Sequence, residues 1–100
     1  MQVKINGNTY PAIVLGKMSD ADWDGRHSKT IRLKMNYATA NALFVDGASW
    51  SIVDGADEFD NSDFNIAGDI TDHRDGMLSV KMGKPTDLEG ILELLYGGDL

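Results

Sequence analysis

The sequence predicts one α+β domain, residues 1–100, built mainly on an antiparallel β-sheet of about five to six short strands. Short segments in which apolar and polar residues alternate recur along the chain, and tight-turn dipeptides such as Asn6-Gly7 separate them. One further segment is rich in alanine and another has apolar residues at helical spacing, so one short helix and one C-terminal helix are expected to pack on one face of the sheet. A chain of 100 residues, 42% of them hydrophobic, can bury one core but not two.

The first half of the chain is expected to hold a hairpin, a further strand and the short helix. Asn6-Gly7 suits a type I′ turn, because both residue types accept a positive φ. Asn36 can cap the alanine-rich helix, and Asp46-Gly47 ends it. In chain order, we expect strands over residues 2–5 and 10–15, a loop over 16–28, a strand over 30–35 and a helix over 37–44.

The second half is expected to contain three strands and the C-terminal helix. Thr86 can cap this helix, and Glu89 completes a capping box. The helix is expected to pack through one apolar stripe, which consists of Leu88, Ile91, Leu92 and Leu95. Before it, we expect a strand over residues 49–53, an acidic loop over 54–63, a strand over 64–70 interrupted at Gly68, a turn over 72–76 and a strand over 78–82.

The composition excludes several classes of protein. The chain has no cysteine, so it cannot form disulfides, thiolate zinc sites or a cysteine nucleophile, and it suits a reducing compartment. Sixteen acidic residues against nine basic ones give a net charge of −7, which argues against direct binding to nucleic acid or to anionic membranes. No apolar run approaches the roughly 20 residues of a membrane helix, and no hydrophobic region of a signal peptide follows Met1.

The negative charge is concentrated in one part of the sequence. Residues 54–75 contain eight acids and a single base, Arg74, so this segment carries the whole net charge of −7 and the rest of the chain is neutral. Residues 17–34 are mildly basic. The sequence therefore predicts a polarised molecule with one acidic surface and a smaller basic one.

One short motif matches part of a known metal site. Asp20, Asp22 and Asp24 alternate before Gly25, as in the opening of an EF-hand calcium loop. The twelfth position of that loop is Ile31, where calcium needs a bidentate glutamate, and a strand follows where a helix belongs. We therefore expect a solvated acidic loop and no bound metal.

Catalytic arrangements are not visible in the sequence. The two histidines, His27 and His73, fall in separate loops and have no metal-ligand spacing, so a zinc site is not expected. The chain has no nucleophile elbow and no glycine-rich phosphate loop. We expect no catalytic residue, no cofactor and no enzymatic activity.

Two groups of residues are candidates for binding a partner. The acidic segment mixes charge with aromatic residues, and it is either a solvated loop or a negatively charged docking surface that could mimic a phosphate backbone. This first group consists of Asp57, Glu58, Phe59, Asp60 and Asp63. The second group could line a pocket for a small anionic ligand, although Trp23 is more readily explained by packing on the core. It consists of Trp23, Arg26, Lys29 and Arg74.

An ordered series of segments resembles a known group of proteins. The segments include Trp23-Asp24-Gly25-Arg26, Tyr37-Ala38-Thr39-Ala40, Trp50-Ser51-Ile52-Val53 and the stretches 68–76 and 80–86. Together they resemble small uncharacterised proteins encoded in prophages of Gram-positive (Firmicute) gut bacteria. The resemblance covers nearly the whole chain and implies a phage origin and expression in the cytoplasm of the bacterial host. That group has no established activity or catalytic motif, so no residue inherits a role.

Three functions fit a small acidic phage protein without a visible active site. The first is a non-enzymatic intracellular inhibitor of a host defence component, similar in role to anti-CRISPR and other counter-defence proteins, which would bind a basic protein surface. The alternative is a structural or assembly protein of the phage tail or head, located in the virion. The third is a sponge for a small nucleotide signal. The partner is expected to be a host or phage protein, and the sequence leaves homo-oligomer formation open.

Overall fold

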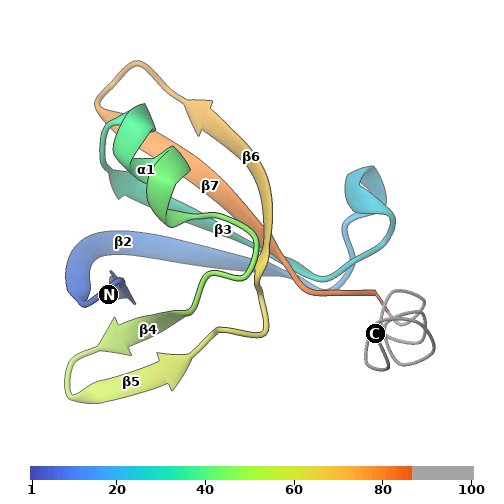
Figure 1. Ribbon diagram of the computed structural model, residues 1–100, viewed down its shortest axis with the longest axis horizontal. Helices are drawn as coiled ribbons and strands as arrows, with labels where there is room; N and C mark the ends of the chain where they lie inside the picture. The colour runs from blue at the N-terminus through green and yellow to red at the C-terminus, as the bar shows by residue number, and fades with distance from the viewer. Residues whose placement is uncertain (87–100) are drawn as a thin grey trace, which may run out of the picture.

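The computed structural model describes residues 1–86, in which seven strands form one antiparallel sheet and one short α-helix packs on it (Figure 1). The elements in chain order are β1 (Gln2–Ile5), β2 (Asn8–Lys17), the 3-10 helix η1 (Ala21–Trp23), β3 (Ser28–Lys34), α1 (Tyr37–Leu43), β4 (Trp50–Asp54), β5 (Asp57–Asp60), β6 (Ile66–Asp72) and β7 (Met77–Gly83). The strand order is β5-β4-β1-β2-β3-β7-β6, so β5 and β6 are the edge strands. The expected mainly antiparallel α+β fold is confirmed over these residues.

The structure differs from expectation in the number of strands. Residues 57–60 form β5, where the sequence predicted an acidic loop. Gly55 has a φ of 63°, at the first position of the two-residue turn between β4 and β5. A glycine with positive φ at that position favours a tight hairpin, and the acidic residues pair with β4 as a result. The helix expected after Thr86, with Leu88, Ile91, Leu92 and Leu95, lies outside the described residues.

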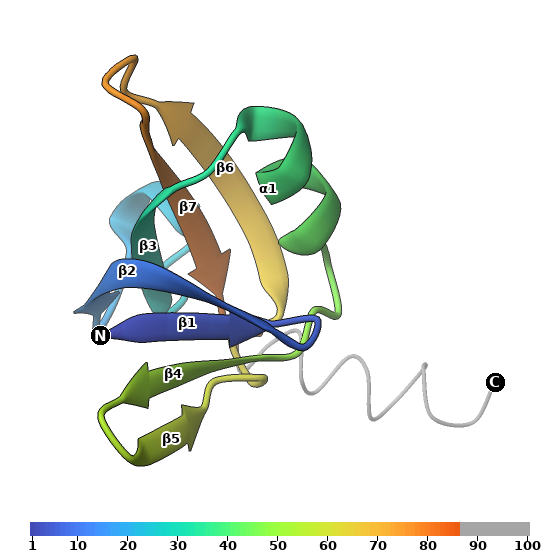
Figure 2. The ribbon, with the colours of Figure 1, turned by 90° about the vertical axis from the view of Figure 1, so that its left-hand side faces the viewer.

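The long strand β2 connects two halves of the sheet. Its first part pairs with β1 from Asn8 to Pro11, and its second part pairs with β3 from Ala12 to Lys17. The two halves cross at a steep angle, with β1, β4 and β5 in one and β3, β7 and β6 in the other (Figure 2). The sheet is therefore strongly bent, and α1 lies on its inner side next to β6 (Figures 1 and 2).

Local turn and cap chemistry agrees with the sequence prediction. Asn6 and Gly7 have φ values of 52° and 81°, as a type I′ turn between β1 and β2 requires. The side chain of Asn36 caps α1, because its Oδ1 accepts a hydrogen bond from the backbone N–H of Thr39 at 2.8 Å.

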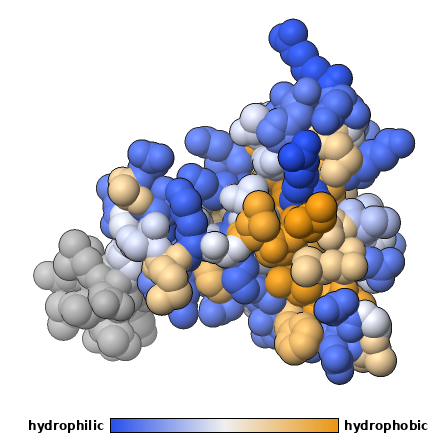
Figure 3. All heavy atoms as spheres, turned by 180° about the vertical axis from the view of Figure 1, so that it is seen from behind, coloured by the Kyte–Doolittle hydropathy of each residue, from blue (hydrophilic) through white to orange (hydrophobic). Residues whose placement is uncertain are grey.

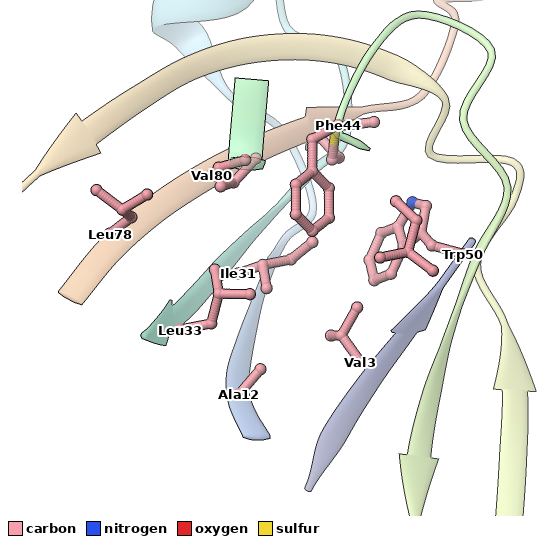
Figure 4. Close-up of a cluster of buried hydrophobic side chains, with 11 residues drawn as sticks. Val3, Ala12, Ile31, Leu33, Phe44, Trp50, Leu78 and Val80 are labelled. Atoms are coloured by element: carbon pink, nitrogen blue, oxygen red, sulfur yellow. The ribbon is translucent and has the colours of Figure 1, made fainter. Parts of the chain in front are cut away.

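The core lies between the inner face of the bent sheet and α1 (Figure 4). Each strand of the sheet's centre contributes alternate residues, and α1 and its C-cap add Ala40 and Phe44. The indole Nε1 of Trp50 donates a hydrogen bond to the carbonyl oxygen of Phe64 at 2.9 Å, so this buried polar group is satisfied. The buried hydrophobic residues are Val3, Ile5, Ala12, Ile31, Leu33, Ala40, Phe44, Trp50, Leu78, Val80 and Met82.

Candidate functional site

The first candidate surface consists of residues 54–63, which are the last residue of β4, the turn, β5 and the three residues that follow it. We call this segment the acidic hairpin. In this hairpin, β5 is the edge strand and all four of its residues are exposed. Phe59 pairs with Ile52 across the hairpin, and while Ile52 packs against the core, the Phe59 side chain is 56% exposed. The structure therefore leaves a large aromatic residue on the surface between acidic neighbours.

The acidic hairpin keeps most of its negative charge uncompensated. It contains five acids and no base, namely Asp54, Asp57, Glu58, Asp60 and Asp63. The ammonium of Lys4 lies 3.5 Å from Glu58 and that of Lys84 lies 3.6 Å from Asp63. All four of these side chains are about half exposed, and such ion pairs contribute little in water.

Asp60 has a defined local conformation. Its Oδ1 accepts hydrogen bonds from the hydroxyl and the backbone N–H of Ser62. These two bonds, the hydroxyl first, lower the pKa of Asp60 below its usual value, against a smaller effect of burial. The carboxylate at the end of β5 is therefore held both ionised and oriented.

The backbone edge of β5 is open. The N–H of Asn61 bonds to the carbonyl of Trp50 at 2.8 Å, which continues the ladder between β4 and β5. Because bonded and non-bonded pairs alternate in an antiparallel ladder, the peptide groups of Glu58 and Asp60 point away from β4. Within residues 1–86, no backbone group bonds to them.

The other edge strand, β6, is partly covered. The N–H of Ala67 donates to Oδ1 of Asp46 at 2.8 Å, and the N–H of Gly47 donates to the carbonyl of Asn65 at 2.7 Å. The loop after α1 thus covers the start of β6. Unprotected strand edges favour pairing with another chain, and β5 meets this description better than β6.

The structure divides the acidic segment of the sequence into two. Residues 54–63 lie at the β5 edge, whereas Asp69, Asp72 and Asp75 lie on β6 and its turn at the other edge. Asp75 is 3.6 Å from the guanidinium of Arg32. All of the acidic residues proposed for partner binding, together with Phe59, belong to the acidic hairpin.

The prediction that the loop after β2 is solvated is wrong for Asp20. Its carboxylate is fully buried, with Oδ2 2.7 Å from Nζ of Lys81 and 3.2 Å from the donating hydroxyl of Ser28. Its Oδ1 accepts from the backbone N–H of Asp22 at 3.2 Å. The bond from Lys81 lowers the pKa of Asp20, and Ser28 and Lys17 add to this effect although burial opposes it.

The geometry of Asp20, Asp22 and Asp24 does not support a calcium site. Asp22 and Asp24 are exposed, while Asp20 is bound to a lysine from β7. Over the part of the chain that the structure describes, no three carboxylate or histidine side chains are grouped so that they could hold a metal ion.

Trp23 packs on the outer face of the sheet, the face opposite α1. A Cβ atom built on Gly68 or Gly83 would come within 2.8 Å of its ring, so these two glycines make room for the indole. The guanidinium of Arg26 lies 5.0 Å from the ring centroid and the ammonium of Lys81 lies 5.6 Å from it. Trp23 therefore packs against the sheet but not on the hydrophobic core, contrary to the prediction from the sequence. The glycines in β6 and β7 were the sequence signal for this contact.

The second group of candidate residues does not come together. Lys29 lies on the inner face, 4.6 Å from the Phe64 ring, and hydrogen-bonds to the side chain of Asn61. Arg74 lies in the turn between β6 and β7, at the opposite end of that hairpin from Gly83. Only Trp23 and Arg26 are in contact, and Arg26 is itself buried.

One contact that sequence reasoning missed joins His73 and Ser79. Their Nε2 and Oγ atoms are 2.6 Å apart, and both side chains lie on the hairpin of β6 and β7. A hydrolytic site also needs a group that orients the histidine. Among residues 1–86 no carboxylate bonds to this ring, and the contact instead closes the turn.

Comparisons with protein-family models, with curated proteins and with solved structures find no match to this chain. None of the helices in the described residues is long and apolar enough to span a membrane.

Proposed function

We propose that this protein is a non-enzymatic binding protein that docks on a basic surface of another protein through the acidic hairpin. The observation that carries the proposal is Phe59, which is 56% exposed in the middle of an acidic edge strand. Aromatic residues supply much of the binding energy in protein interfaces when they enter a pocket on the partner.

The parts of the acidic hairpin have different roles in this proposal. The carboxylates attract a basic partner over a distance and raise the rate of association. Phe59 then becomes buried and slows dissociation. Because Asp54 and Asp57 lie on the same face of the hairpin as Phe59, the partner would present a hydrophobic pocket with basic residues beside it.

The kind of partner is proposed from the resemblance to prophage-encoded proteins. An intracellular inhibitor of a bacterial defence component would block a basic, nucleic-acid-binding surface of its target in the host cytoplasm, without itself binding nucleic acid. The alternative, an assembly protein of the phage tail or head, is favoured by the open edge of β5, which can pair with another chain. A nucleotide sponge has less support, because Trp23, Arg26, Lys29 and Arg74 do not line one pocket.

Two quadruple variants test the proposal. The first neutralises the acidic hairpin with Asp57→Asn, Glu58→Gln, Asp60→Asn and Asp63→Asn. The second is a control that removes the same number of charges elsewhere, with Asp22→Asn, Asp24→Asn, Asp69→Asn and Asp72→Asn. Each protein is immobilised and exposed to an extract of a Gram-positive host, and the captured proteins are quantified by mass spectrometry.

The proposal predicts that the wild type and the control retain a protein with a basic surface, and that the hairpin variant loses it. Capture of the same proteins by all three would overturn the proposal. Detection of this protein in purified phage particles, together with no captured host protein, would favour the assembly role instead.

A further inference from the structure

The outer face of the sheet carries an apolar patch of a kind that solvated strands normally avoid. Ile13 and Leu15 of β2 both point outward and are 57% and 64% exposed, and Met18 after the strand is 82% exposed. Seen from this side, hydrophobic atoms gather in the middle of the sheet (Figure 3). Outward positions of an antiparallel sheet are usually polar when that face meets water.

Basic residues border this patch on the same face. Ile13 is paired with Arg32 on β3, and Leu15 is paired with Thr30, whose other neighbour is Lys81 on β7. Lys17 follows two residues after Leu15 and is itself more than half exposed. Lys17 and Lys81 share the buried Asp20 as their counter-charge, and Arg32 lies 3.6 Å from Asp75. These three bases and two acids leave the border of the apolar patch with a net positive charge, opposite to that of the acidic hairpin.

The same part of β2 also has an open backbone edge. The pairing of β2 with β1 ends at Pro11 and Gln2, and one further bond follows, in which the carbonyl of Met1 accepts the N–H of Ala12 at 3.2 Å. Among residues 1–86, β2 is paired from Ile13 to Lys17 on one side only, with β3. By the alternation of an antiparallel ladder, the peptide groups of Val14 and Gly16 point to the unpaired side.

We propose that copies of this chain associate head to tail, with the acidic hairpin of one copy lying along the open edge of β2 in the next. This inference rests on the proposed role of the acidic hairpin as a docking surface and names a second copy as one of its partners. Pairing β5 with the open edge of β2 would satisfy peptide groups on both strands and bring Phe59 to Ile13 and Leu15.

Charge favours this head-to-tail arrangement over the two symmetric ones, in which β5 would pair with β5 or β2 with β2. Two β5 strands side by side would place carboxylates opposite carboxylates, and two β2 edges, in which Lys17 is the one charged residue from Ile13 to Lys17, would bring no opposite charges together. Only the pairing of β5 with β2 joins opposite charges, which stabilises cross-strand pairs where like charges destabilise them. The net charge of −7 repels separate copies, but physiological salt screens charges beyond about 8 Å.

A head-to-tail contact uses two different surfaces of each copy, so it propagates into a ring or a filament. The test therefore uses two full-length variants, one for each surface. Leu15→Glu places a negative charge in the apolar patch, and Asp57→Lys reverses the one charge of β5 that lies on the same face as Phe59. Tyr37→Glu, at an exposed position on α1, is the control for adding a charge.

Analytical ultracentrifugation at physiological ionic strength, from micromolar to near-millimolar protein, measures the mass of each sample. We expect the wild type and Tyr37→Glu to grow beyond two chains with concentration, while each surface variant alone stays monomeric. An equimolar mixture of the two surface variants should form a two-chain complex and stop there, because only one intact pair of surfaces remains.

A wild type that stays monomeric at every concentration would overturn the inference. So would association that Leu15→Glu abolishes and the β5 variant retains, since that result indicates a symmetric contact between β2 edges. The proposed docking function fails separately: it fails if neutralising the hairpin leaves capture of a host protein unchanged, whatever the oligomeric state.

Discussion

The carboxylate Oδ2 of Asp20 lies 2.7 Å from Nζ of Lys81, so the loop after β2 is joined to the strand β7. The Asp20 side chain is fully buried, and Ser28 on β3 donates a further hydrogen bond to the same oxygen. Two charges with this geometry stabilise each other, and removing Lys81 would leave the fully buried Asp20 without its nearest counter-charge. The loop that carries Trp23 is thereby fixed to the sheet.

Replacing Asp20 should change how stability depends on pH. The bond from Lys81 lowers the pKa of Asp20 below its ordinary value of 3.8, so its ionised form stabilises the folded state. That contribution is present above the ordinary value and is lost as the pH falls through the lower, folded-state pKa. Asp20→Asn should therefore lower the free energy of unfolding at neutral pH and flatten its decline in acid. Urea denaturation over a series of pH values measures this, with the exposed Asp22→Asn as control. Parallel pH curves for the wild type and Asp20→Asn would rule out the role assigned to this ion pair.

Adding a methyl group at Gly83 should destabilise the fold through Trp23. The new Cβ would come within 2.7 Å of the Trp23 ring and of Cδ of Arg26. Overpacking of this kind costs about 1–3 kcal/mol. Gly16→Ala is the matched control, because a Cβ there meets open space.

A double-mutant cycle identifies the cause of that destabilisation. If the indole is the obstacle, Gly83→Ala should cost less in a Trp23→Ala background than in the wild type, because the residue it collides with has gone. Denaturation followed by circular dichroism gives the four free energies of unfolding. Additive effects would show that the loss arises elsewhere in the strand.

Calcium should not stabilise the protein. Oδ2 of Asp20 is bound to Lys81 and Ser28, and Asp22 and Asp24 are exposed on either side of Trp23. We expect the melting temperature to stay the same when millimolar calcium is added. A clear rise in melting temperature that Asp22→Ala abolishes would contradict this assignment of the loop.

The elements that sequence reasoning predicted correctly are those with local causes. Asn6-Gly7 determines its own turn, Asn36 caps its own helix, and residues 30–35 and 78–82 alternate clearly enough to predict strands. In each case the decisive residues lie within a few positions of one another.

The features that were missed depend on distant residues. The strand β5 looked like a loop because three of its four residues are acidic, and only pairing with β4 makes it a strand. Asp20 is buried because Lys81 reaches it from β7. Residues 12–15 are all apolar, so their pattern could not show that Ile13 and Leu15 face outward.

The kinetics of association test the central claim, that the acidic hairpin docks a basic partner, most directly. Binding of the protein captured in the extract experiment is measured on a surface at two salt concentrations. The variant with Asp57→Asn, Glu58→Gln, Asp60→Asn and Asp63→Asn should associate more slowly than the wild type and depend less on salt, with little change in stability because these charges are exposed. Phe59→Ala should instead dissociate faster. An association rate that neutralisation leaves unchanged would contradict the docking role and reduce the hairpin to a solvated surface.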